Sequence, residues 1–141
     1  MEMNDCINSI LSNTQNTVYN YFKRKLQEYE TTPSQYTLLR CLWKQDGLTP
    51  SQLAQALRLD TSTVTGILGR LEKKGLIVRN YNPEDRRSVS IHLCEGGKVL
   101  WKQIDQAIDE ANAKILSGID QESYSQFLAC LSVMEKNAVS E

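Results

Sequence analysis

One stretch, residues 59–76, limits what this chain can fold into more than any other. Its apolar side chains recur at the spacing of an α-helix and form one continuous face: Val64, Ile67, Leu68 and Leu71. Asp60 or Thr61 can cap the start of such a helix, and Gly75 is typical of a left-handed, glycine-capped end. The pattern therefore predicts an amphipathic helix with a defined beginning and end.

The face opposite this apolar stripe is small, hydroxyl-bearing and basic. Its side chains, with those on its flanks, are Ser62, Thr63, Thr65, Gly66, Gly69, Arg70 and Lys73. This face has no carboxylate before Glu72, and each of its two glycines costs ~1 kcal/mol relative to alanine. Such a face suits close approach to the major groove of DNA, where base edges meet Thr, Ser and Arg. The alternative is an ordinary amphipathic helix with a weakly polar face.

A short helix is predicted immediately before this one. Thr49-Pro50-Ser51-Gln52 combines a Thr cap, a Pro at the first helical position and a Gln three residues after the cap. The same combination at residues 32–35 predicts a helix over 33–45. Only residues 58–60 separate the short helix from the one that follows, which is the spacing of a helix-turn-helix with the second helix as the reader.

Two β-branched segments follow the reading helix. Residues 76–79 and 88–93 are predicted strands, and the second alternates strictly. The residues between them, 80–87, have loop composition and end in the basic pair Arg86-Arg87. A helix-turn-helix followed by a hairpin with a long basic tip is a winged helix.

Further amphipathic helices are predicted on both sides, over about 5–29, over 95–117 and after Asp120. The expected fold is therefore mainly α with a small β-hairpin wing. Residues 32–94 would form the winged helix-turn-helix DNA-binding domain, and residues 1–31 and 95–141 a helical dimerisation region. Pairing with a second copy would cover the apolar faces of these helices and present two reading helices to a pseudo-palindromic site.

Charge and composition narrow the function. The net charge is −1, yet residues 50–93 alone carry +3, as expected for a DNA-binding segment. A single histidine and the lack of a phosphate loop argue against an enzyme. The four scattered cysteines and an isolated His92-x-Cys94 pair predict neither a metal site nor a cofactor. Without a signal peptide or an apolar span in the sequence, we expect a cytoplasmic location.

The chain resembles the multiple-antibiotic-resistance regulator (MarR) family of bacterial transcription factors. The resemblance rests on Gln35-Tyr36, Thr63-Val64-Thr65, Leu68-Gly69-Arg70-Leu71-Glu72, Lys74-Gly75-Leu76-Ile77 and Pro83-Glu84-Asp85-Arg86-Arg87-Ser88, which holds the Asp-x-Arg signature of the family's wing. It implies a triangular homodimer whose reading helices enter major grooves, while Arg87 reaches the minor groove. It also implies repression relieved by a small phenolic or anionic ligand, or by thiol oxidation in one subgroup.

The predicted function is therefore a sequence-specific, double-stranded DNA-binding regulator, a ligand-responsive repressor that binds its operator as a homodimer. The predicted DNA contacts are Ser62, Thr63, Thr65, Gly66, Arg70, Lys73, Asp85, Arg86 and Arg87. A predicted effector pocket comprises Tyr19, Tyr36, Arg40 and Trp43, although aromatic side chains at helical spacing are more often core residues. Two alternatives stay open: a thiol-sensing regulator that uses Cys6 or Cys94, and a winged helix that contacts another protein.

Overall fold

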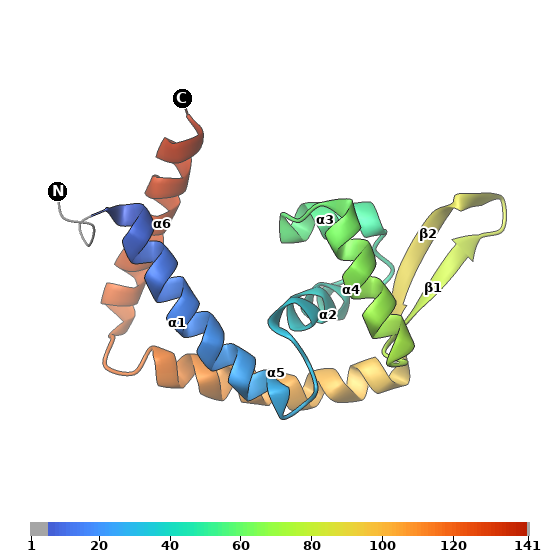
Figure 1. Ribbon diagram of the computed structural model, residues 1–141, viewed down its shortest axis with the longest axis horizontal. Coiled ribbons are helices and arrows are strands. Elements are labelled where there is room, and N and C mark those ends of the chain that lie inside the picture. The colour runs from blue at the N-terminus through green and yellow to red at the C-terminus, as the bar shows by residue number, and fades with distance from the viewer. Residues whose placement is uncertain (1–5, 141) are drawn as a thin grey trace. The chain divides into compact units, whose positions relative to one another are not determined.

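The computed structural model describes residues 6–140, apart from the side chain of Arg86. It contains six helices and a two-stranded antiparallel hairpin, which confirms the predicted fold class (Figure 1). The elements are α1 (Ile7–Gln27), α2 (Pro33–Lys44), α3 (Pro50–Leu57), α4 (Thr61–Lys73), β1 (Ile77–Asn82), β2 (Asp85–Leu93), α5 (Glu95–Ile115) and α6 (Gln121–Val139). The chain divides after Ala111 into two compact units, so the winged helix belongs entirely to the first unit.

The helices begin where their capping residues predict. The hydroxyls of Thr32 and Thr49 each accept the backbone amide of a glutamine three residues on, and that glutamine's side chain accepts the threonine amide in return. Asp60, rather than Thr61, caps α4: its Oδ1 accepts the amide of Thr63 at 2.7 Å. The end of α4 is also as predicted, because Gly75 adopts φ +73°, which an L side chain rarely tolerates.

The main core lies between α4 and the elements around it. The apolar face of α4 is buried against side chains from α2, α3 and both strands; the innermost residues are Leu38, Leu39, Leu42, Leu53, Val64, Leu68, Leu71 and Ile91. A second, smaller cluster joins α1 to α5 through Leu26, Ile104 and Ile108. Figure 1 shows α3 and α4 together, with the hairpin beginning near the C-terminal end of α4 and extending outward from it. Burial of its apolar face fixes the rotation of α4 and leaves the opposite face to solvent.

The wing differs from its predicted form. Residues 80–87 were expected as a loop, but the strands extend to Asn82 and restart at Asp85, so that these two residues pair. A register shift after Tyr81 absorbs the irregularity, and the Asn82 side chain accepts the amide of Glu84 at 3.0 Å to close the turn. Leu48 also pairs with Ile91 from outside the hairpin, which the sequence pattern did not indicate.

The last helix, α6, belongs to the second compact unit. Asp120 caps it by accepting the amide of Ser123 at 2.7 Å, as predicted. None of its described residues is buried, and its apolar side chains Phe127, Leu128, Val133 and Met134 are exposed on the single chain. Among residues 6–140, no helix has the length and apolar character needed to cross a membrane.

Two glycines should respond oppositely to alanine. A Cβ at Gly97, in the first turn of α5, would lie 2.3 Å from the carbonyl oxygen of Leu76, whereas one at Gly69 would meet nothing within 4 Å beyond its own helix in the described chain. We expect Gly97→Ala to lower the free energy of unfolding by about 1–3 kcal/mol and Gly69→Ala to raise it by up to about 1 kcal/mol. Urea unfolding of the two variants measures both changes. Equal stabilities would contradict this packing of α5.

Candidate nucleic-acid interface

The outer face of α4 gathers six of the predicted contact residues. Ser62, Thr63, Thr65, Gly66, Arg70 and Lys73 are all exposed. The helical spacing therefore identified which side of α4 faces solvent. These side chains come from more than three successive turns, so they form one strip along the helix.

Hydrogen bonds within α4 determine what its hydroxyls can offer a ligand. Ser62 Oγ donates to Asp60 Oδ1 at 2.8 Å, and Thr65 Oγ1 donates to the carbonyl of Thr61 at 2.8 Å. Each hydroxyl has one proton, so both remain available as acceptors only. Contact with DNA bases would therefore use amino groups of adenine or cytosine as donors, or the threonine methyl against a thymine methyl.

The cap of α4 is a carboxylate held in its charged form. The backbone amide of Thr63, together with hydrogen bonds from the side chains of Thr63 and Ser62, lowers the pKa of Asp60. Asp60 thus occupies an amide at the helix N-terminus that would otherwise attract an anion. The positive charge of the outer face lies at the other end of α4, at Arg70 and Lys73.

The two glycines of α4 have no packing role inside the described chain. An added Cβ at Gly66 or Gly69 meets nothing within 4 Å beyond its own helix. Glycine weakens a helix, so internal packing gives no reason for either residue. Because glycine has no side chain, these two positions leave the helix backbone accessible to a flat partner.

Lys74 differs from its neighbour Lys73. The Lys74 ammonium donates to the carbonyl of Glu30 and, at 3.0 Å, to Oε1 of the buried Gln35. It therefore joins the end of α4 to the junction of α1 and α2. The sequence analysis counted Lys74 in the basic segment. It could not indicate where the Lys74 side chain points, because its partners lie 39 and 44 residues away.

At the tip of the wing, Asp85 accepts the backbone amide of Arg87 at 3.1 Å. This bond is ordinary turn chemistry, because it contacts the backbone of Arg87 and not its guanidinium. The Arg87 side chain is exposed, and that of Arg86 lies outside the described part of the chain. The hairpin thus extends Arg87 away from the core on a strand that continues to the base of the wing.

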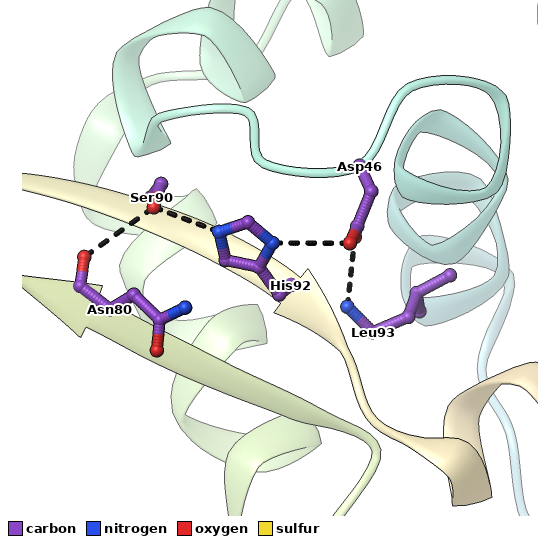
Figure 2. Close-up of polar contacts among 5 residues, drawn as sticks. All are labelled: Asp46, Asn80, Ser90, His92 and Leu93. Carbon is purple, nitrogen blue, oxygen red and sulfur yellow. Dashed lines mark hydrogen bonds and ion pairs between the residues drawn. The ribbon is translucent and has the colours of Figure 1, made fainter.

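Three polar contacts at the base of the wing were not predicted. Arg79 on β1 pairs with Glu72 on α4 at 3.5 Å. His92, expected only as half of an incomplete metal site, lies in a chain of hydrogen bonds with Asp46 and Ser90 (Figure 2). Within the part of the chain that the structure describes, no three His, Cys, Asp or Glu side chains gather as a metal site would require.

The four residues of the predicted effector pocket divide into two groups. Tyr19 and Tyr36 line a pocket of about 250 Å³ between α1 and α2, together with apolar residues that include Val18, Phe22, Leu26 and Pro33. Arg40 and Trp43 do not line it. The Trp43 ring instead stacks on Trp101 of α5, which also stacks on Tyr36 with centroids 5.6 Å apart. Burial raises the pKa of Tyr36 although Arg40 opposes the shift, so Tyr36 is a neutral phenol.

The cysteines are free and lie in different surroundings. Backbone amides of Ser9 and Asn8 lower the pKa of the half-buried Cys6 thiol at the start of α1, whereas burial raises the pKa of Cys41. The amide of Cys94 donates to the carbonyl of Leu76, immediately before α5. Thiol sensing through Cys6 or Cys94 stays a prediction.

Comparison with known proteins identifies the group to which this architecture belongs. The sequence pattern of the MarR family matches residues 31–89, from the cap of α2 into β2. The HTH-type transcriptional regulator MgrA of Staphylococcus aureus is 33% identical over 109 residues, which are 76% of this chain and 74% of that protein. The chain belongs to the MarR family. MarR family proteins are DNA-binding regulators and not enzymes, which confirms the expectation that this chain is not an enzyme.

Other MarR-type relatives extend the comparison. The organic hydroperoxide resistance transcriptional regulator of Bacillus subtilis (strain 168) is 40% identical over 79 residues, 56% of this chain. The chain spans about half the length of this relative, 54%. The crystal structure of the S. aureus MepR–DNA complex matches 94% of this chain and 98% of MepR, with a TM-score of 0.87 and 28% identity.

Adjacent lysines at the end of α4 should differ in their effect on stability. Lys74→Met retains the aliphatic stem but leaves the Glu30 carbonyl and the Gln35 side chain without the ammonium donor. We expect it to lower the free energy of unfolding by roughly 1–2 kcal/mol, while Lys73→Met, on the exposed face, changes it by less than about 0.5 kcal/mol. Urea unfolding at two salt concentrations provides the comparison. Equal effects of both substitutions would contradict a structural role for Lys74.

Proposed function

We propose that this chain is a sequence-specific regulator of transcription that binds double-stranded DNA in the cytoplasm. The observation that carries the proposal is the exposed strip of α4. Its two glycines have no internal packing role and leave the helix backbone uncovered beside basic side chains. A partner that is flat and anionic accounts for both properties. The likeness to MepR, whose structure was solved as a DNA complex, supports this choice of partner.

In this proposal α4 enters the major groove and the wing lies beside it. The acceptor oxygens of Ser62 and Thr65 and the methyl group of Thr65 meet base edges, while Arg70 and Lys73 meet phosphates. Arg87, and Arg86 next to it, reach the minor groove, whose negative potential favours a guanidinium. Asp85 shapes the tip by holding the Arg87 backbone. The charge of +3 over residues 50–93 favours DNA over a protein partner.

The operator is proposed to be pseudo-palindromic and the protein a homodimer. Exposed apolar side chains on α1 (Ile7, Ile10 and Leu11) and on α6 (Phe127, Leu128, Val133 and Met134) support this, because a monomer leaves them in water. A two-fold dimer through residues 1–31 and 95–141 would present two copies of residues 32–94 to successive major grooves.

We further propose that the protein is a repressor released by a small phenolic or anionic molecule. The pocket between α1 and α2 has room for one aromatic ring, and the aromatic side chains of Tyr19 and Tyr36 are part of its lining. A ligand there would contact Tyr36, whose ring also packs on Trp101 of α5. Binding would thereby act on the position of α2, against which α4 packs.

The two DNA-reading parts should be separable by mutation. Arg87→Ala removes a cation from the wing, so binding should weaken on most sequences and the salt slope should fall by roughly one unit. Thr65→Ala removes the acceptor and the methyl group from a fixed helix. It should cost ~1–3 kcal/mol on the operator while sparing non-specific binding. Fluorescence titrations against the operator, found by genome-wide footprinting, and against random duplex at several salt concentrations measure both effects.

Two outcomes would contradict this placement of the reading elements. One is an equal loss of operator and random-duplex binding in Thr65→Ala. The other is unchanged binding in Arg87→Ala. Lys73→Met serves as the control for a contact with phosphate alone. It should lower the salt slope without changing the preference for the operator.

Dimerisation is tested by mass. Sedimentation at low micromolar concentration should give about 32 kDa, twice the 16.0 kDa of one chain, because the exposed faces of α1 and α6 need a partner. Phe127→Glu places a charge in the apolar face of α6 and should shift the protein toward the single-chain mass. A folded monomer of the native chain at that concentration would exclude the proposed dimer.

A further inference from the structure

Tyr81 is an aromatic side chain of the wing for which the described chain offers no partner. It is 60% exposed, more than any other aromatic side chain among residues 6–140. Within that range its hydroxyl has no hydrogen bond, and its ring has no aromatic or cationic neighbour. Because residues 80–87 were expected as a loop, Tyr81 was not among the predicted DNA contacts. It lies instead in β1, and a strand gives each of its residues a defined face.

The register of the hairpin determines the face on which Tyr81 lies. Alternate residues of a strand share a face, so Tyr81 lies on the same face as Ile77 and Arg79. Ile77 is buried in the main core, and Arg79 pairs with Glu72 on α4. Tyr81 is the last residue before the register shift, and Val89 opposite it packs against the main core. Tyr81 therefore lies on the face of the hairpin that is turned toward α4.

Exposure along this face increases from the base of the wing toward its tip. Ile77 is buried, Arg79 is half-buried and Tyr81 is exposed. β1 extends outward from the end of α4, and at the usual rise of a strand Tyr81 lies roughly 13 Å along it from Ile77 (Figure 1). Exposure alone does not identify a partner, because single exposed apolar residues are common on protein surfaces. The position of Tyr81 between two proposed DNA-reading elements does.

The geometry of DNA determines what would meet this position. In B-DNA the sugar–phosphate backbone separates each major groove from the neighbouring minor groove. With α4 in the major groove and Arg87 in the minor groove, that backbone would pass the part of β1 between the end of α4 and the tip. On the face turned toward α4, this part carries Arg79 and Tyr81. The Arg79 guanidinium already faces Glu72 at 3.5 Å, which leaves the Tyr81 phenol to meet the backbone.

We propose that Tyr81 is a DNA-contacting residue whose hydroxyl donates a hydrogen bond to a backbone phosphate between the two grooves. The inference rests on the proposed DNA-binding function and adds a contact that does not come from a basic side chain. Tyrosine is one of the side chains that hydrogen-bond to phosphate oxygens, and its phenol supplies the proton of the bond. Such a contact fixes the register of α4 and the wing on the duplex without reading a base.

The first test separates the hydroxyl from the ring. A duplex of about 30 base pairs, selected by the native protein from a random pool, covers two half-sites. Tyr81→Phe retains the ring and removes the donor, so the Kd should rise about three- to tenfold for each half-site. The salt slope should stay unchanged because no cation is lost, whereas Arg87→Ala should lower it by roughly one unit. Val78→Thr, on the opposite face of β1, is the control and should leave the Kd unchanged.

The second test locates the contact on the DNA. Each backbone phosphate of one half-site is replaced in turn by a methylphosphonate, which removes the charge and one acceptor oxygen. At the phosphate that Tyr81 contacts, this replacement should weaken binding less for Tyr81→Phe than for the native protein, because the bond is already absent. That phosphate should lie between the major groove that α4 enters and the minor groove at the wing. At the other phosphates the two losses should be additive.

Three results would overturn this contact. One is an unchanged Kd in Tyr81→Phe. Another is a set of additive losses at every phosphate, because the hydroxyl would then act without touching the backbone. The third is the single-chain mass for Tyr81→Phe in sedimentation, which would show that the side chain contacts a second copy. All three leave the proposed function intact, since the native protein still binds its duplex. Failure of the native protein to select any duplex would contradict DNA binding itself and, with it, this inference.

Discussion

The structure depends on the burial of one face of α4. Val64, Leu68 and Leu71 are completely buried in a core that α2, α3 and the hairpin share. A helix with 3.6 residues per turn cannot bury one face without fixing the direction of the opposite one. The strip from Ser62 to Lys73 therefore points outward because of the core, and not because of any contact that it makes itself. The side chains of that strip can therefore be replaced without disturbing the core packing that orients the strip.

Periodicity and capping chemistry predicted the elements because both act over a few residues. The capping boxes at Thr32 and Thr49, the Asp60 cap and the glycine end of α4 all depend on partners within five residues, and all occur as expected. The outer face of α4 followed from the same local rule. The wing tip did not, because strand pairing continues into residues of loop composition, with a register shift after Tyr81.

Contacts between distant residues could not be inferred from one sequence. Lys74 with Gln35, Asp46 with His92, and Trp101 with Tyr36 join segments whose separation carries no local pattern. The predicted effector pocket shows the consequence. Its residues on α2 share helical spacing, but the approach of Trp101 from α5 takes Trp43 into a stack and leaves Tyr36 between the stack and the pocket.

Two adjacent residues of α2 place the proposed effector pocket close to the reading helix. Tyr36 lines the pocket, and its neighbour Gln35 accepts the ammonium of Lys74 at the end of α4. A ligand that rotates α2 about its axis would therefore strain the hydrogen bond that fixes that end. It can do so only if it binds the two positions of α2 with different affinity, since equal affinity shifts no equilibrium. Because Tyr36 is stacked on Trp101, the resisting force comes from α5. Under the proposed function, release from DNA would thus depend on the balance between the ligand contact with Tyr36 and the stacking of Tyr36 on Trp101.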